Sequence, residues 1–179
     1  MPKVISLSKD DQHQFSKRNC DSLNLLTGLG VEGDAHCGAT VKHRSRVRAD
    51  AEQPNLRQVH LIHSELLSEL QDKGFNVRAG TLGENILTKD LNVLALPRNS
   101  LLKIGKDTVL RVTGLRNPCA QLDNFQQGLT KACLDQDGSG GVRRKAGVMA
   151  VVEAGGTIYV NDVIIVEYPP EPFEALEPV

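Results

Sequence analysis

The stretch LLKIGKDTVLRV, residues 101–112, decides the fold class of this chain. Two short aliphatic runs with interspersed polar residues flank Gly-Lys-Asp, and this layout is typical of two strands joined by a tight turn. Residues 157–167, TIYVNDVIIVE, have the same layout with Asn-Asp at the turn. The two segments therefore predict two β-hairpins, which account for their similarity without an internal repeat.

Further short strands are predicted on both sides of these hairpins, separated by Gly, Asn, Asp or Pro. They cover residues 4–8, 58–62, 83–88 and 147–155. One short helix is predicted after Ser64, which can cap it, with Leu66, Leu67 and Leu70 on one face and Gly74 at its end. The pattern predicts a mainly β fold with short helices, arranged as a barrel or a sandwich.

The composition indicates one domain and excludes several classes of function. A chain of 179 residues suits a single domain, which we place at residues 1–168. The net charge is −1 and aromatic residues make up 3%, so a nucleic-acid-binding surface is not expected. No signal-peptide pattern and no membrane-length apolar run is present, so we expect a soluble, cytoplasmic protein.

Two segments are expected to lie outside the compact part of the domain. Residues 41–55 are basic and have no regular apolar spacing, so we interpret them as a mobile, solvated excursion. Residues 169–179 are rich in Pro and Glu, and we expect them to form an extended, peripheral tail.

Four cysteines are too few for a disulfide scaffold, so free thiols in a reducing compartment are expected. One of them stands in LRNPCAQL, residues 115–122. Because Asn is a favoured N-cap and Pro a favoured first helical residue, Asn117 is predicted to cap a helix whose first turn contains Pro118 and Cys119. The helix dipole and Arg116 would favour a thiolate, which can attack a sulfur donor, hold a persulfide or bind a soft metal.

A buried cysteine often only fills space, and that interpretation of Cys119 stays open. Cys37 lies in a glycine-rich loop without an ordered helix dipole, although His36 could assist it. Cys20 lies in a polar stretch and Cys133 in an apolar phase, and both are expected to be inert.

Three patterns that resemble ligand motifs are set aside. Gly28, Gly30 and Gly33 satisfy G-x-G-x-x-G, but no helical pattern follows, so we interpret them as a glycine-rich loop. Residues 135–140 begin like a calcium loop, but Ala146 stands where a bidentate glutamate is needed. Zinc is not favoured, because no C-x-x-C pair accompanies the candidate ligands, which are His36, Cys37, His43, His60 and His63.

Taken together, several stretches resemble the MOSC domain, the module named after the C-terminal region of molybdenum-cofactor sulfurase. They occur in the family's order, and such a series is far rarer by chance than any single motif. The stretches are GVEGDAHCG (30–38), RQVHLI (57–62), GTLGENILT (80–88), VLALPRNSLLKIG (93–105), VTGLRNPCAQLD (112–123) and AGVMAVVEAGGTIYVNDVIIVE (146–167).

This resemblance implies a MOSC-type β-barrel with short helices, and a cysteine that carries sulfur or contacts molybdenum; Cys119 occupies that position. It implies that the pocket is lined by Arg57, Gln58, Asn85 and Arg116. It implies that the pocket walls are shaped by Gly33, Asp34, Gly83, Glu84 and Gly147. The chain departs from the family at Asn161, where glycine is frequent, and near Cys37, whose role stays open.

Three functions follow as alternatives. The first is a stand-alone sulfur carrier or sulfurtransferase: a partner cysteine desulfurase, which would itself hold the pyridoxal phosphate, loads a persulfide onto Cys119, and the sulfur passes to an acceptor such as molybdenum cofactor. The second is a molybdenum-cofactor-dependent reductase of N-hydroxylated compounds with Cys119 as metal ligand. The third is a non-catalytic module that binds an anion or a partner.

In the first two functions, Arg116 acts beside Cys119, and other cations and amides bind the cofactor. The segment GSGGVRRK, residues 138–145, supplies two of these cations, unless it is only an exposed basic loop. The candidate cofactor-binding residues are Arg57, Gln58, Asn85, Asn117, Arg143 and Lys145.

Overall fold

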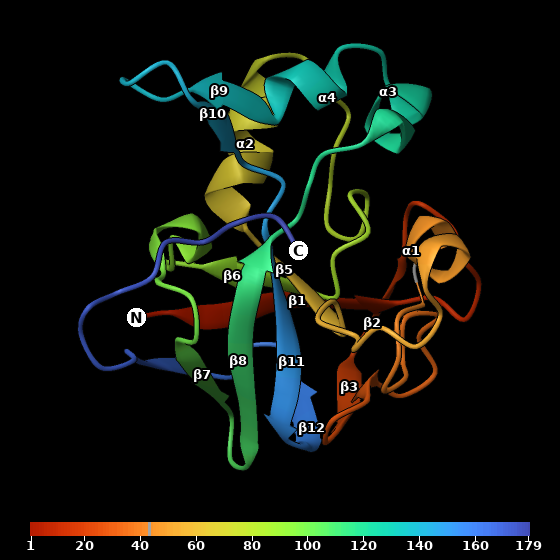
Figure 1. Cartoon of the computed structure of the whole chain (residues 1–179), viewed down its shortest axis with the longest axis vertical. Helices are drawn as coiled ribbons and strands as arrows, with labels where there is room; N and C mark the ends of the chain where they lie inside the picture. Colours follow the sequence, from red (N-terminus) through yellow and green to blue (C-terminus); the bar gives the residue numbers. More distant parts are fainter. Residues whose placement is uncertain (43) are drawn as a thin grey trace.

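The computed structural model describes residues 1–42 and 44–179, and its main element is an eight-stranded sheet (Figure 1). In spatial order its strands are β13 (Ile164–Glu167), β7 (Leu101–Ile104), β8 (Thr108–Leu115), β11 (Val148–Ala154), β5 (Val59–His63), β6 (Ile86–Lys89), β1 (Lys3–Lys9) and β2 (Arg18–Cys20). All neighbours are antiparallel except β5 and β6. The mainly β fold with short helices is confirmed.

Closure of this sheet into a barrel stays a prediction. An isolated bridge between Lys3 and Val163 links β1 with the chain just before β13, so the two sides of the sheet approach each other. A continuous ladder between β1 and β13 is not among the strand pairs of the described residues.

The hairpin predicted at residues 101–112 is confirmed as β7 and β8. The two strands pair from Leu101 opposite Arg111 to Ile104 opposite Thr108. The turn between them contains Gly105 at a φ of 62°, a left-handed conformation that favours glycine.

The hairpin predicted at residues 157–167 is wrong, because its two strands join different sheets. β12 (Gly156–Tyr159) pairs with β3 (Ser22–Leu26), which also pairs with β4 (Gly30–Val31), whereas β13 pairs with β7. The turn itself forms, with the Tyr159 N–H donating to the Asp162 carboxylate at 2.8 Å. An alternating pattern identifies strands but does not select their partners, and β3 lies in a glycine-punctuated segment for which no strand is predicted.

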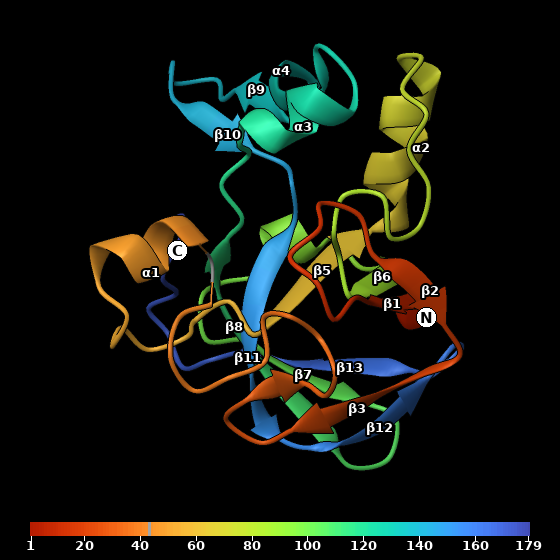
Figure 2. The ribbon, with the colours of Figure 1, turned by 90° about the vertical axis from the view of Figure 1, so that its right-hand side faces the viewer.

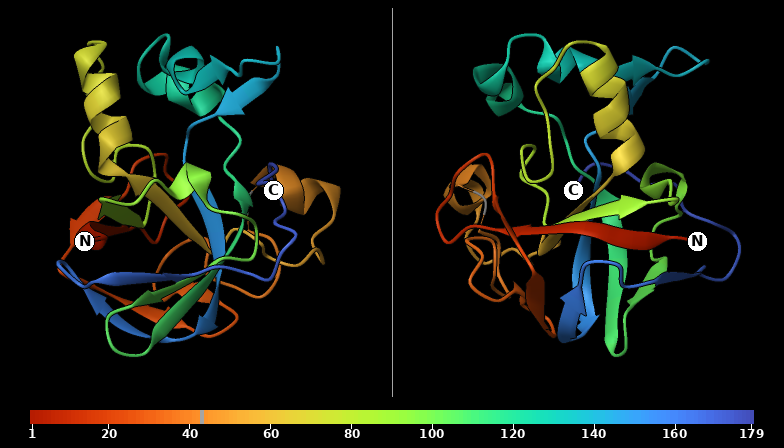
Figure 3. Two further views of the ribbon diagram at one scale, coloured as in Figure 1. Left: turned by 90° about the vertical axis from the view of Figure 1, so that its left-hand side faces the viewer. Right: turned by 180° about the vertical axis from the view of Figure 1, so that it is seen from behind.

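Helices α2 (Ser64–Asp72), α3 (Ala120–Phe125) and α4 (Leu129–Ala132) gather at one end of the eight-stranded sheet, whereas α1 (Arg44–Ala49) lies to one side, and the three-stranded sheet β12–β3–β4 lies toward the other end (Figures 1 and 2). β8 leads into α3 and α4, which are followed by the strand pair β9 (Leu134–Gln136) and β10 (Val142–Arg144). Figure 3 shows α2 and the α3–α4 segment rising from the same end of the sheet.

The helix predicted after β5 is confirmed as α2 (Ser64–Asp72), which buries Leu66, Leu67 and Leu70. Its predicted cap is wrong, because His63 is the N-cap and Ser64 is already helical. The Ser64 hydroxyl donates to the Glu65 carboxylate at 3.2 Å instead of capping the helix.

Strand β5 separates two hydrophobic clusters. Leu61 belongs to the larger cluster, which packs on one face of the eight-stranded sheet. Its neighbour Ile62 points to the other face and belongs to the smaller cluster, which packs against the helices. This division follows from the strand geometry, since successive side chains point to opposite faces. The smaller cluster also contains Leu66, Leu122 and Leu129, so it joins α2 to α3 and α4.

The two segments expected outside the compact part have defined conformations here. Residues 44–49 form α1 (Arg44–Ala49), and the tail is extended, with the Leu115 N–H donating to the Glu177 carbonyl at 2.8 Å. A single turn of 3-10 helix, η1 (Val93–Ala95), precedes β7. No helix in the described part of the chain could cross a membrane. The mobility of residues 41–55 and the domain limit at residue 168 stay predictions.

Candidate functional site

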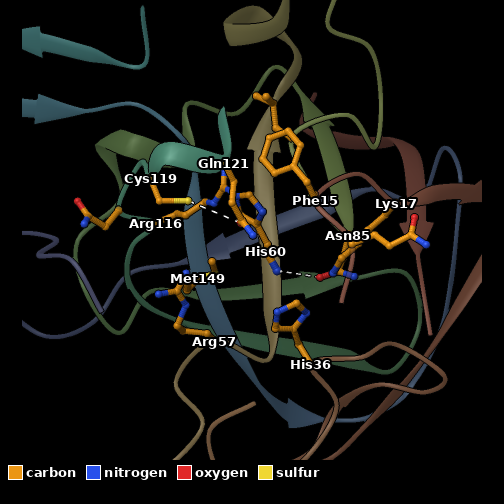
Figure 4. A pocket seen from close by; sticks show the side chains of 14 residues that line it. Phe15, Lys17, His36, Arg57, His60, Asn85, Arg116, Cys119, Gln121 and Met149 are labelled. Carbon is orange, nitrogen blue, oxygen red and sulfur yellow. Dashed lines mark hydrogen bonds between the residues drawn. The ribbon is translucent and has the colours of Figure 1, made fainter. Parts of the chain in front are cut away.

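A pocket of about 220 Å³ opens beside the start of α3, the middle of β5 and the loop before β2 (Figure 4). Its lining includes one thiol, Cys119, and three cationic side chains, Lys17, Arg57 and Arg116. No Asp or Glu is among the described residues that line it. Its amide side chains are those of Gln14, Asn85, Asn117 and Gln121.

Cys119 occupies the N-cap of α3, so the predicted helix start is wrong by two residues. Its φ of −130° and ψ of 170° are extended, and α3 begins at Ala120. Asn117, the predicted cap, accepts a hydrogen bond from Arg144 Nε at 2.9 Å instead. The chain therefore stays non-helical through residues 117–119, and Pro118 disfavours a helical conformation in the residue before it.

The Cys119 thiol is half-buried and faces the pocket. It donates a weak hydrogen bond to Gln121 Oε1 at 3.7 Å, as the dashed line in Figure 4 shows. The helix makes no side-chain cap hydrogen bond. The thiol is thus oriented by a neutral amide and remains accessible from the pocket.

Arg116 is the buried cation nearest to Cys119 in the sequence. It is 7% exposed, and its guanidinium lies 5.8 Å from the centre of the Phe15 ring, a cation–π contact. Its Nη1 atom is buried without a hydrogen-bond partner in the described part of the chain. Burial lowers the pKa of Arg116, while its attraction to the negative form of Cys119 acts in the opposite direction.

Lys17 is held by a buried carboxylate beneath the pocket. Its Nζ atom lies 2.9 Å from Asp34 Oδ1, and the two side chains are 5% and 0% exposed. Burial alone would raise the pKa of Asp34, but hydrogen bonding with His36 and the charge of Lys17 hold it well below its usual range. Asn85 Nδ2 also donates to Asp34, at 3.2 Å. Asp34 thus compensates Lys17.

His60, which lines the pocket, and Glu84, which is not among the lining residues, also carry titratable groups. Burial, aided by the charge of Arg116, lowers the pKa of His60 well below its usual value, so its ring is neutral near pH 7. Burial raises the pKa of Glu84 to about 7. One Glu84 oxygen accepts from the Gly80 N–H at 2.6 Å, and the other is buried without a partner in the described residues.

The pocket brings together five of the predicted site residues, and three lie elsewhere. The five are Arg57, Asn85, Arg116, Asn117 and Cys119. Gln58 is buried, and its amide hydrogen bonds with two backbone groups at 3.0 Å. Lys145 is buried and pairs with Glu69 and Asp135. Arg143 is exposed on β10 and lines a separate hollow beside the tail.

Two of the glycines assigned to the pocket walls lie close to backbone carbonyl oxygens and have positive φ angles. Gly83 has a φ of 84°, and a Cβ there would meet the carbonyl oxygen of Phe15, which lines the pocket. Gly147 has a φ of 91°, and a Cβ there would clash with the Leu61 carbonyl oxygen. Asn161, the departure from the family pattern, has a φ of 75°, which Asn tolerates better than most residues.

The other three thiols have environments that disfavour the thiolate. Burial raises the pKa of Cys20, and burial with the charges of Asp34 and Glu32 raises the pKa of Cys37. Burial raises the pKa of Cys133 to about 11, and this side chain is fully buried. No cluster of three or more His, Cys, Asp or Glu side chains within residues 1–42 and 44–179 could hold a metal ion, and His43 lies outside the described residues.

Several residues that line the pocket are not among the predicted site residues. His60 and Gln121 lie inside stretches that carry the family resemblance, so those motifs could have suggested them. Lys17 and Phe15 lie in a polar stretch without any local signal. The role of Lys17 depends on its burial against Asp34, which only the fold creates.

Comparison with known proteins agrees with this fold. The MOSC domain family matches residues 33–165. The YuaD protein from Bacillus subtilis has a similar structure, with a TM-score of 0.75 at 24% identity over 95% of this chain and 98% of that one. YiiM from Geobacillus stearothermophilus gives 0.69 at 15% identity over 98% and 80% of the two chains. YiiM from Escherichia coli gives 0.64 at 18% identity over 97% and 73%. No curated protein sequence matches.

Proposed function

We propose, from the premise that this chain belongs to the MOSC domain family, that it is a sulfur carrier. In this proposal Cys119 holds sulfur as a persulfide and delivers it to a metal–sulfur acceptor such as molybdenum cofactor. The observation that supports it most is the position of the Cys119 thiol in a pocket whose described lining contains cations and no carboxylate.

The loading step is a thiol–persulfide exchange. The Cys119 thiolate attacks the outer sulfur of a persulfide on a partner cysteine desulfurase. A sulfur–sulfur bond forms to Cys119, the donor's sulfur–sulfur bond breaks, and the donor cysteine leaves as a thiolate. Passing the sulfur on to molybdenum as sulfide takes two electrons, which an external thiol would supply.

Arg116 is the cation best suited to stabilise the persulfide. A persulfide is an anion near neutral pH, and charge-assisted hydrogen bonds are stronger than neutral ones. Lys17 is already compensated by Asp34, and Arg57 donates from Nη1 to the Val179 carbonyl at 3.1 Å. The Nη1 atom of Arg116 has no hydrogen-bond partner among the described residues, so it can donate a hydrogen bond to the persulfide.

The test is to incubate the protein with a cysteine desulfurase and cysteine, and then to determine its mass. Wild type is expected to gain one sulfur atom that a reducing thiol removes. Cys119→Ser should gain none, and Cys37→Ser, which changes a thiol outside the pocket lining, should gain sulfur like wild type. Absence of the added sulfur from wild type, or equal labelling of Cys119→Ser, would exclude the carrier function.

A second candidate is a molybdenum-cofactor enzyme that reduces N-hydroxylated compounds. The lining fits the metal end of such a cofactor, because a cysteine thiolate is a soft ligand and Arg57 and Arg116 can contact anionic groups. When bound, the cofactor would supply the two-electron reduction, and Arg116 would orient the substrate or cofactor anion.

The two candidates differ in what the isolated protein contains. A reductase purified from a host that makes molybdenum cofactor is expected to carry molybdenum in proportion to protein, and Cys119→Ser should lose it. A carrier is expected to contain no stoichiometric metal and to accept sulfur from the desulfurase. Metal analysis beside the mass measurement therefore separates them.

A further inference from the structure

The pocket has the features of a site for a small anion as well as for a sulfur atom. Arg116 is more than nine-tenths buried, lines the pocket and has a guanidinium nitrogen without a partner in the described residues. Burial of such a donor costs free energy unless a ligand pairs with it. The Cys119 thiol lines the same pocket.

We propose that the pocket also takes sulfur directly from a small sulfane-bearing oxyanion of the thiosulfate type, without a protein donor. This inference rests on the proposed carrier function, because it assigns a second sulfur source to the same Cys119 thiol. It adds a substrate class that the site can recognise by charge and size.

The size of the pocket favours a ligand of a few atoms. Its volume of about 220 Å³ is below the range of roughly 300–1,000 Å³ that is usual for sites of drug-sized ligands. A tetrahedral sulfur oxyanion has five heavy atoms and fits such a volume, whereas a whole pterin cofactor would extend beyond it.

The charges around the pocket favour an anion. No carboxylate is among its described lining residues, and the buried Asp34 behind it is paired with Lys17 at 2.9 Å. Arg116 has the Phe15 ring on one side, interacts with the buried Glu84 carboxyl through its charge, and keeps its Nη1 atom without a hydrogen-bond partner within residues 1–42 and 44–179. Its guanidinium therefore has a hydrogen-bond donor that a small anion can use.

The remaining polar groups suit an oxyanion. Figure 4 shows Cys119, Arg116 and Gln121 on the same side of the pocket, with His60 close to them in this view. All four belong to its lining. The Gln121 amide nitrogen and the Arg116 guanidinium can donate to sulfonyl oxygens, while the thiol next to them approaches the terminal sulfur.

The proposed step is balanced without a further reagent. The Cys119 thiolate attacks the terminal sulfur of thiosulfate, and a new sulfur–sulfur bond forms. The sulfur–sulfur bond of thiosulfate breaks, and sulfite leaves with the electron pair. One thiolate and one dianion become one persulfide anion and one sulfite dianion, so atoms and charge are conserved. Arg116 stabilises the negative charge that gathers on the leaving sulfite.

The experiment compares three sulfur reagents on one protein: thiosulfate and inorganic polysulfide, which can each add one sulfur atom, and a neutral dialkyl trisulfide, whose reaction with Cys119 forms an alkyl mixed disulfide that is also followed by mass. Thiosulfate is expected to add one sulfur atom to Cys119 and to release one sulfite for each atom added. Loading from polysulfide but not from thiosulfate would overturn this inference and leave the carrier function standing. Loading from none of the three reagents, while a cysteine desulfurase with cysteine still loads Cys119, would overturn this inference alone, and failure of the desulfurase as well would contradict both.

Arg116→Gln tests the anion site. The lost charged hydrogen bond should lower the rate with thiosulfate relative to the rate with the neutral trisulfide by at least about tenfold. Arg116→Lys, which keeps the charge, should recover part of that ratio. Arg143→Gln, which removes a cation outside the pocket, should leave the ratio unchanged. An unchanged ratio in Arg116→Gln would refute the assignment.

The wild-type protein offers a second test if Arg116→Gln does not fold. Added sulfate, an unreactive tetrahedral oxyanion, is expected to slow loading from thiosulfate competitively and to slow the reaction with the neutral trisulfide less. Equal effects of sulfate on the two reagents would show that no anion site contributes to thiosulfate loading.

Discussion

Replacing Glu84 with Gln is expected to stabilise the protein at neutral pH while changing its stability little near pH 4.5. Burial raises the pKa of Glu84 from an ordinary value of 4.5 to about 7. Between these two values the unfolded chain has released a proton that the folded protein still holds. The free energy of unfolding therefore falls as the pH rises through this window, and Gln, which mimics the protonated carboxyl, removes the fall.

The size of the effect follows from the two pKa values. The gap between 4.5 and about 7, at roughly 1.4 kcal/mol for each pH unit, corresponds to a destabilisation on the order of 3 kcal/mol above pH 7. The unpartnered Glu84 oxygen agrees with this sign, because an ionised oxygen there receives no hydrogen bond from the described residues.

Urea denaturation of wild type and Glu84→Gln from about pH 4.5 to about pH 8 measures the difference. The buried His60 also titrates, but it is present in both proteins, so its contribution largely cancels. Glu69→Gln is the matched control with the opposite sign, because hydrogen bonds from Lys145 and Lys73 lower the pKa of Glu69. A difference between wild type and Glu84→Gln that is constant with pH would refute the reasoning.

Three further predictions concern buried groups. Lys17→Met is expected to lower the free energy of unfolding by about 3–5 kcal/mol, because it leaves Asp34 as an unpaired buried charge. In urea denaturation, the double variant with Asp34→Asn should recover part of this loss, and no recovery would argue against a stabilising Lys17–Asp34 pair. Gly147→Ala should lower the melting temperature more than Gly28→Ala. Both positions have a positive φ, but only at Gly147 would the added Cβ meet a backbone carbonyl oxygen. A larger loss of melting temperature in Gly28→Ala would contradict this. Cys133 should react with iodoacetamide only after unfolding, since its pKa is about 11 and it is fully buried, and fast labelling of the native protein would exclude that environment.

The strands were predictable where their pattern is local. β7 and β8 lie on either side of the turn that the Gly-Lys-Asp sequence indicates, and α2 differs from its predicted bounds by a residue or two. The partner of β12 was not predictable, because the turn at Asn161 fits a hairpin equally well. Pairing with β3 depends on contacts more than a hundred residues apart, for which the pattern of one strand gives no information.

The site residues were predictable where a local sequence motif indicates their chemical role. The stretch around Cys119 indicated the thiol and the adjacent Arg116, and both line the pocket. Lys17 was not predictable, because its charge matters only through Asp34, a residue that the fold brings within 2.9 Å. Lys145 shows the opposite error: its position in a basic run suggested a ligand contact, yet Glu69 and Asp135 pair with it.

The revised position of Cys119 changes which group supports the proposed chemistry. The sequence suggested that the positive end of a helix would stabilise the sulfur anion. α3 has only six residues and begins after Cys119, and the Cys119 carbonyl already accepts the Leu122 N–H at 3.0 Å. Such a short helix has a weak dipole, and its effect falls off within one turn. The stabilisation must therefore come mainly from Arg116, so replacing this one cation should impair sulfur transfer more than any change that shortens α3.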